Sequence, residues 1–212
     1  MRRRAFAAAA WGAAALAAGA SFSRAIRDGT PTAPSGALPE SRLPRPLGEM
    51  AFELIDQDGR AVGPKDLAGR PSAIFFGFTH CPDVCPTTLA DLGGWLDGLG
   101  ERADELDVVF ITVDPERDTV EAVAEYLSYF DSRIRGWTGT PDQVAAAADG
   151  FRVSYEKVPG EGDAYAMNHT SSVFLYRADG TFKGTIDYHD AREVAPLKID
   201  DVMNAGTLKP AP

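Results

Sequence analysis

The sequence is poor in cysteine, histidine and basic residues. Its 212 residues include two Cys, three His and 21 Lys or Arg, against 31 Asp or Glu. Two cysteines exclude a disulfide-framework miniprotein and a zinc site built from four thiolates. The formal net charge of -10 leaves no diffuse basic field for a phosphate backbone, so nucleic acid is not an expected partner. A charged fraction of 25% and a mean hydropathy of -0.18 exclude a polytopic membrane protein.

Residues 1–20 are predicted to be a signal peptide or an N-terminal membrane anchor. Three arginines at positions 2–4 precede an uncharged, alanine-rich run over residues 5–20, which ends in the small residues that a signal peptidase reads. Arg3, Arg4 and the two residues after them resemble the core of a twin-arginine signal, and the general secretory (Sec) route is the alternative. The positive-inside rule then places the rest of the chain on the periplasmic side of the inner membrane.

Composition divides the remaining chain into three parts. Residues 21–47 hold five prolines and little apolar periodicity, which is typical of an extended, flexible tether. Residues 48–206 are predicted to form one globular domain, and residues 207–212 a short tail. The tether would give the domain reach toward a membrane-bound partner, and a plain spacer is the equal alternative.

The domain alternates predicted strands and helices. Strands are expected at 52–55, 72–78, 106–113, 173–176 and 181–186, and helices from Pro86, after Asp118, near Pro141 and over 193–203. A capping box of Asp118 and Glu121 is expected to start the second helix. This order predicts an α/β sandwich on a mixed sheet with a C-terminal hairpin and helix, and ligands are expected beyond the carboxyl ends of the strands.

Both cysteines stand between a predicted buried strand and a helix start. Cys81 and Cys85 are four residues apart in FTHCPDVCPTT, and Pro82 and Pro86 stiffen the loop after each of them. A helix N-terminus favours the thiolate, which is the form that binds metal and attacks disulfides. The spacing lets both sulfurs face one metal ion or each other. A plain stabilising disulfide is the alternative in an exported protein.

Three segments of the domain together resemble the Sco/SenC family of thioredoxin-like copper-binding proteins, which help assemble cytochrome oxidase. They are FFGFTHCPDVCPTTLADL, ITVDPERDTVEAVAEYL and NHTSSVFLYRADG, and the similarity runs from about Phe52 to Met203. The resemblance implies a thioredoxin-like fold, with Cys81, Cys85 and His169 as copper ligands. It also implies a metal-binding assembly factor, not an enzyme. Its partner would be the copper-bearing subunit of cytochrome c oxidase, with other copper chaperones or thiol reductants as further partners.

Coordination chemistry agrees with copper at this set of ligands. Two soft thiolates select Cu(I), and an added imidazole gives a site that also holds Cu(II). Zinc prefers a fourth protein ligand, so it ranks below copper. Three ligands leave an open position, through which a Cys or His of a partner can take the metal by ligand exchange. The predicted function is therefore that of a copper metallochaperone, which binds one copper ion and delivers it to the copper centre of the oxidase.

The other histidines and the neighbours of His169 are expected to have lesser roles. His80 is expected to hydrogen-bond within the loop, because a residue adjacent to a motif cysteine points away from it. His189 has no motif support, and Met167 is expected to fill a gap in the core. Asn168 departs from the family, which usually has an acid there, and this removes a charge that could tune the imidazole.

The segment Asp114–Asp118 also matches a loop of the family. Helix capping by Asp118 and an ion pair with Arg117 account for this segment without a catalytic role. The expectation is therefore a structural one.

Two other classes of function stay open. An exported thiol-disulfide oxidoreductase would use Cys81 and Cys85 as attacking and resolving thiols. Thioredoxin-type reductases instead have Cys-x-x-Cys, with a cis-proline before the next strand where this chain has Ser171 and Ser172. A peroxiredoxin normally lacks a second thiol four residues upstream of its reactive Cys. A module that senses copper or redox state is the second of these classes.

Overall fold

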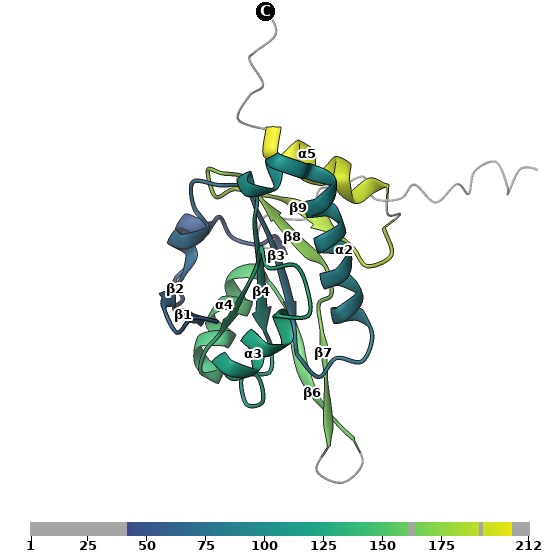
Figure 1. The fold of residues 1–212 in the computed structure, drawn as a ribbon. Helices are drawn as coiled ribbons and strands as arrows, with labels where there is room; N and C mark the ends of the chain where they lie inside the picture. Colours follow the sequence, from purple (N-terminus) through teal and green to yellow (C-terminus); the bar gives the residue numbers. More distant parts are fainter. Residues whose placement is uncertain (1–41, 161–163, 191–192, 205–212) are drawn as a thin grey trace, which may run out of the picture. The chain divides into compact units, whose positions relative to one another are not determined.

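The computed structural model describes residues 42–160, 164–190 and 193–204. The strands are β1 Leu54–Asp56, β2 Ala61–Val62, β3 Ser72–Gly77, β4 Asp107–Thr112, β5 Ile134–Thr138, β6 Tyr155–Pro159, β7 Tyr165–His169, β8 Val173–Tyr176 and β9 Phe182–Ile186. The helices are α2 Val84–Leu99, α3 Val120–Leu127, α4 Pro141–Phe151 and α5 Val194–Asn204, with 3-10 helices η2 Leu47–Glu49, η3 Pro64–Leu67 and η4 Gly100–Glu105. Seven strands form one mixed sheet in the order β2-β1-β5-β4-β3-β8-β9, and β6 and β7 form a separate two-stranded ribbon (Figure 1).

The centre of the sheet consists of β3 and β4, which run parallel and are buried along nearly their whole length. Their sequences, SAIFFG and DVVFIT, are largely continuous apolar runs, as expected for strands covered on both faces. β5 is parallel to β4, whereas β8 pairs antiparallel with β3. Because β3 and β4 are parallel, the loops that follow them lie at the same edge of the sheet.

Helices cover both faces of this sheet. The ring of Phe76 meets that of Phe151 in α4 with centroids 5.3 Å apart, so α4 covers one face. The next residue, Gly77, points to the opposite face, where a Cβ would lie 3.0 Å from Cys85 Sγ of α2. α3 packs on β5, and α5 packs on α2 and the β8–β9 hairpin. The start of α2 therefore lies directly over the end of β3.

Most of the predicted elements are confirmed, including the mixed sheet and the C-terminal hairpin and helix. α4 begins at Pro141 behind a capping box in which Thr140 and Gln143 bond each other's backbone. The hairpin between β8 and β9 turns at Gly180, whose φ of 80° is the left-handed conformation that glycine adopts readily.

Two helix starts differ from the prediction. α2 begins at Val84 rather than Pro86, so Cys85 lies inside its first turn. The predicted capping box of Asp118 and Glu121 is wrong, because the N-cap of α3 is Thr119, whose hydroxyl accepts from the backbone N–H of Ala122 at 3.2 Å. The Asp118 carboxylate turns into the protein instead, where the hydroxyl of Thr112 donates to it.

The strand β5 and the β6–β7 ribbon were not among the predicted elements. β5 has the sequence IRGWT, in which Arg and Gly interrupt the apolar pattern. Gly136 is needed there because a Cβ would lie 2.4 Å from Val123 and 2.5 Å from Leu127, both of α3. β7 is exposed at alternate positions, whereas most of β6 is exposed, and the two strands pair from Tyr155 opposite His169 to Pro159 opposite Tyr165. Neither element carries a strong apolar period.

The residues just before position 48 are bonded to the domain. The N–H of Arg45 donates to the carbonyl of Gly150 at 3.0 Å, and that of Leu47 donates to Gly180 at 2.9 Å. The predicted signal or anchor at 1–20, most of the tether and the tail at 207–212 lie outside the described residues. Within those residues, none of the helices combines the length and the apolar character that a membrane crossing requires.

Candidate metal centre

The two cysteines come from the loop after β3 and from the first turn of α2. The N–H of Cys81 donates to the carbonyl of Phe78 at 3.2 Å, which folds the loop back over the end of the strand. The N–H of Cys85 donates to Cys81 Sγ at 3.3 Å. This N–H is one of those that a helix N-terminus leaves without an intrahelical partner. Both residues are free thiols, with Cys85 fully buried and Cys81 partly exposed.

Gly77 makes room for the buried sulfur. A Cβ at this position would lie 3.0 Å from Cys85 Sγ and 2.8 Å from the ring of Phe110. Because these neighbours are themselves packed in the core, they have little space into which to move. The absence of a side chain at position 77 therefore sets where the Cys85 sulfur lies.

We expect Gly77→Ala to lower the free energy of unfolding by about 1–3 kcal/mol, since overpacking a dense core costs that much. Gly94→Ala is the matched control, because Gly94 lies in α2 and a Cβ there meets nothing within 4 Å. That control should be neutral or stabilising by up to about 1 kcal/mol, given the higher helix propensity of Ala. Urea unfolding of the two variants measures the difference, and equal stabilities would contradict the close packing described here.

His169 is the last residue of β7 and approaches the cysteines from the opposite side of the loop. Its Nδ1 lies 2.9 Å from the carbonyl oxygen of Thr170. Since a carbonyl only accepts, Nδ1 carries the proton and the lone pair of the neutral ring is on Nε2. Nε2 lies 3.5 Å from Cys85 Sγ. The rings of Phe75 and Phe78 contact the imidazole edge-to-face, with centroids 6.2 and 5.8 Å away, and fix its plane.

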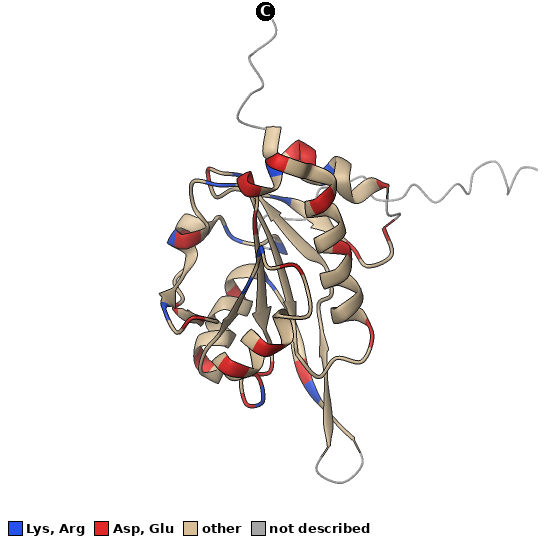
Figure 2. Ribbon diagram, in the orientation of Figure 1, with Lys and Arg blue, Asp and Glu red and all other residues tan. Residues whose placement is uncertain are grey.

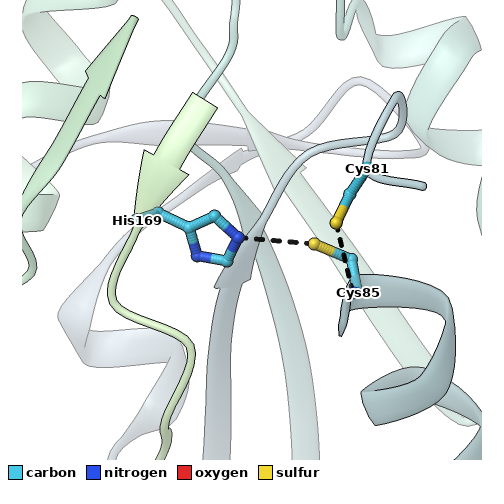
Figure 3. A group of neighbouring side chains, drawn as sticks. All are labelled: Cys81, Cys85 and His169. Atoms are coloured by element: carbon cyan, nitrogen blue, oxygen red, sulfur yellow. Dashed lines mark hydrogen bonds between the residues drawn. The ribbon is translucent and has the colours of Figure 1, made fainter. Parts of the chain in front are cut away.

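Cys81, Cys85 and His169 thus converge on one point (Figure 3). Their two Sγ atoms and the imidazole nitrogen all lie within 4.8 Å of one another. Within the described residues this is the group of His, Cys, Asp and Glu side chains whose ligand atoms could share a metal ion. Cys85 and His169, which are 84 positions apart, are brought together because β8 begins four residues after His169 and its first residue, Val173, pairs with Phe75 near the end of β3.

The two thiols have opposite pKa shifts. The hydrogen bond from the Cys85 thiol lowers the pKa of Cys81 to about 4 against the opposing effect of burial, and contacts with His169 and with the backbone N–H groups of Asp83 and Cys85 lower it further. The same contact with Cys81, together with burial, raises the pKa of Cys85 well above its ordinary value. One proton is therefore held between two sulfurs, with Cys81 as the thiolate and Cys85 as the donor near neutral pH.

We expect the ultraviolet thiolate absorbance of the reduced protein to rise with pH through a midpoint near 4. The sign follows from the lowered pKa, since Cys81 is protonated below that pH and ionised above it. In strong denaturant the midpoint should return to about 8.5, the ordinary cysteine value. Cys81→Ser should abolish the acidic transition. A folded wild-type protein that titrates only above neutral pH would contradict the assignment.

The other sequence candidates lie outside this cluster. His80 is exposed, and its Nδ1 lies 3.0 Å from the hydroxyl of Thr79, as expected for hydrogen bonding within the loop. His189 contacts Tyr188 in the loop after β9, with ring centroids 5.3 Å apart. Met167 is buried, with 9% of its surface exposed, and belongs to the core as predicted.

The Asn168 side chain contacts the partner strand of the ribbon, β6. Its amide donates to Glu156 Oε1 at 3.1 Å, and Glu156 is its direct partner across the strands. A carboxylate is therefore present next to Asn168, but it belongs to Glu156 of β6 and not to the residue at position 168.

The sequence prediction missed the residues that hold the cluster in place. Asp118 is fully buried, and its carboxylate accepts from the N–H and the hydroxyl of Thr79 at 3.0 and 2.6 Å. Thr79 lies two residues before Cys81. Their positions in the sequence could have indicated this contact. Thr79 follows β3 and Asp118 follows β4, and polar residues that follow two neighbouring parallel strands meet at one edge of the sheet.

Comparison with known proteins identifies relatives over the described domain. The SCO1/SenC family model matches residues 41–204. The chain is 41% identical over 133 residues to the mitochondrial SCO1 homolog 1 of Arabidopsis thaliana, covering 62% of this chain and 40% of that protein. It is 39% identical over 159 residues to the mitochondrial SCO2 homolog of Homo sapiens, covering 74% and 59% respectively. The matched region is thus about half the length of these two curated relatives.

Solved structures show the same fold. The structure of Bradyrhizobium japonicum ScoI with copper bound is 41% identical, with a TM-score of 0.67, and the match covers 71% of this chain and 96% of that one. The crystal structure of yeast Sco1 with copper bound is 34% identical, with a TM-score of 0.68, over 80% and 91% of the two chains. The thioredoxin-like fold expected from the sequence is confirmed.

Proposed function

Because the chain belongs to the SCO1/SenC family, we propose that it is a copper metallochaperone, which binds one copper ion and delivers it to the copper centre of cytochrome c oxidase. The observation that carries the proposal is the convergence of Cys81, Cys85 and His169 within 4.8 Å. The copper in the solved structures of the bacterial and yeast relatives supports the choice of metal.

The donor set fits copper as cargo. Two soft thiolates suit Cu(I), and the imidazole extends the site to Cu(II). The low pKa of Cys81 makes one thiolate available near neutral pH, whereas Cys85 has to lose its proton when the metal binds. His169 offers Nε2 in the correct tautomer, because Nδ1 donates to Thr170. Three protein ligands leave one position for a ligand of the acceptor, and Cys81 and His169 are both partly exposed.

The proposed partner is the copper-bearing subunit of the oxidase, with other copper chaperones or thiol reductants acting before it. The proposed location is the periplasmic side of the inner membrane, reached by export or by anchoring through residues 1–20. Acidic residues are spread over the helices and loops of the domain and not gathered on one surface (Figure 2). This distribution gives no support to a nucleic-acid partner.

A second candidate function is thiol-disulfide exchange, which the pKa of Cys81 favours. The Cys81 thiolate would attack a disulfide and release one thiolate of the substrate. Cys85, after losing its proton, would then break the mixed disulfide, so that the substrate gains two electrons and the two cysteines form a disulfide. We propose copper delivery as the main role because Cys81, Cys85 and His169 together form a donor set that suits copper, whereas the exchange needs only the two thiols.

The test is an anaerobic transfer experiment with the reduced protein loaded with one equivalent of Cu(I). We expect copper to move to a metal-free copper-binding domain of the oxidase subunit, while turnover of a disulfide substrate stays slow. His169→Ala separates the two functions, because it removes a copper ligand while the main contact that keeps Cys81 as a thiolate, the hydrogen bond from Cys85, remains, so copper transfer should fall more than disulfide exchange. Rapid disulfide turnover with no copper bound by the wild-type protein would favour the oxidoreductase.

A further inference from the structure

We infer that the acid loop, residues Asp114–Asp118 between β4 and α3, is the device that positions both halves of the metal centre. Its Asp118 carboxylate holds the loop that carries Cys81, and its Asp114 carboxylate holds the strand that carries His169. This inference rests on the proposed function, since it concerns how that site is held. It assigns positioning roles to Asp118, Asp114, Arg117 and Tyr165, none of which is a proposed metal ligand.

The first half of the device is Asp118. Its side chain is fully buried and accepts three hydrogen bonds, two from Thr79 at 3.0 and 2.6 Å and one from the hydroxyl of Thr112 at 2.5 Å. Burying a carboxylate costs free energy unless hydrogen bonds replace those to water, so all three bonds are needed to keep Asp118 buried. They tie the first residues after β3 to the end of β4 and so fix the start of the cysteine loop.

The second half is a clasp formed by Asp114, Arg117 and Tyr165. Asp114, with 2% of its surface exposed, accepts from Arg117 Nε at 2.5 Å and from the hydroxyl of Tyr165 at 2.8 Å. Arg117 also donates from Nη1 to the carbonyl of Tyr165 at 3.1 Å, and its guanidinium carbon lies 3.7 Å from the centre of the Tyr165 ring. The acid loop therefore holds Tyr165 by its hydroxyl, its ring and its backbone.

Tyr165 and His169 are the first and last residues of β7. Residues four apart on a strand point to the same face, so both side chains face the body of the domain. The β6–β7 ribbon projects from the sheet and has no hydrogen-bonded strand neighbour in it (Figure 1). A two-stranded ribbon is marginally stable by itself in water, so it needs contacts with the domain to keep one position. The clasp supplies such contacts at the end of β7 opposite the imidazole.

The functional consequence should differ between the two oxidation states of copper. The thiolates belong to the cysteine loop and α2, whereas the imidazole belongs to the ribbon. Because the imidazole is what adapts the site to Cu(II), loosening the ribbon should weaken Cu(II) binding more than Cu(I) binding. The clasp residues therefore act through His169.

The test compares Tyr165→Leu and Arg117→Gln with Glu116→Gln in the reduced, full-length chain. Glu116 is the matched control because it joins the same loop to the same ribbon through an exposed ion pair with Lys157 at 2.8 Å. We expect the clasp variants to bind Cu(II) about 10–100-fold more weakly, the range typical for residues that orient a ligand, with a changed nitrogen coupling in electron paramagnetic resonance. Cu(I) affinity should change less than about threefold, and Glu116→Gln should match the wild type.

A His169→Ala background separates positioning from a general folding defect. If the clasp acts through His169, Tyr165→Leu should have no further effect on Cu(II) affinity in that background. An equal loss with and without His169, or an unchanged Cu(II) signal in folded Tyr165→Leu and Arg117→Gln, would overturn the inference. If those variants do not fold, Tyr165→Phe removes only the hydroxyl and should show a smaller shift in the same direction; a wild-type signal there would equally overturn it. Failure of the wild type itself to bind copper would instead reject the proposed function.

Discussion

Replacing either cysteine with serine should lower the affinity for Cu(I) by more than about 100-fold. Removing a residue that only orients a metal ligand already lowers metal affinity by up to about 100-fold, and here a soft ligand itself is lost, so the loss should be larger. A serine hydroxyl does not ionise near neutral pH and is a hard donor, so it cannot stand in for a thiolate. Competition against a Cu(I) chelator of known affinity, under anaerobic conditions, measures the loss.

The two serine variants should differ in stability although they agree in copper binding. Cys85 is fully buried against Gly77, whereas Cys81 is partly exposed. Cys85→Ser therefore places a hydroxyl in an apolar site and should lower the free energy of unfolding by about 1–3 kcal/mol, and Cys81→Ser by less. Wild-type Cu(I) affinity in either folded variant would show that the metal lies elsewhere.

His169→Ala should weaken Cu(II) binding by more than about 100-fold, to a residual affinity that is still measurable, while largely retaining Cu(I) binding. The two thiolates alone suit Cu(I), and only the imidazole supplies the nitrogen donor that Cu(II) prefers. The ring also fills the space between Phe75 and Phe78, so part of the site opens when it is removed. We expect a weaker thiolate-to-Cu(II) absorption band at equal copper and loss of the nitrogen coupling in electron paramagnetic resonance.

His80→Ala is the matched control for this prediction. His80 adjoins Cys81 in the sequence, yet its side chain is exposed and bonds Thr79. Its removal should leave both copper affinities within about threefold of the wild type, as expected for an exposed side chain. If His80→Ala lost Cu(II) and His169→Ala kept it, the two histidines would have been assigned the wrong way round.

The sequence was sufficient to predict that Cys81 and Cys85 lie close together at the start of a helix. Cys81 and Cys85 are close in the chain, and the helix that begins between them follows from the leucine spacing of α2, so local pattern was sufficient. The predicted helix start, Pro86, is two residues too late, and the difference matters chemically. Because α2 begins at Val84, the N–H of Cys85 lies in the first turn, where it donates to Cys81 Sγ. Helix ends depend on which N–H groups find partners, and spacing alone does not show this.

Assigning His169 to the site required both the family resemblance and the fold. His169 is named through a resemblance, and the fold places it at the end of a strand of the separate ribbon. Most residues of β6 are exposed and Met167 is the one buried residue of β7, so the apolar pattern of the ribbon is too weak to reveal it. Asp118 was read as a helix cap because Asp is common there, but burial and the hydroxyls of Thr79 and Thr112 turned it inward.

The sequence by itself determined the chemistry of this protein, namely two soft sulfur donors at a helix start, an acidic chain and an alternating α/β order. Those properties are local, since they depend on residue type and on neighbours within one or two turns of the chain. Only the tertiary structure decided which histidine meets the sulfurs, why the Asp118 carboxylate turns inward, and what holds the ribbon in place. These depend on contacts between residues 39 to 84 positions apart, which form only when the strands pair and bury the groups between them.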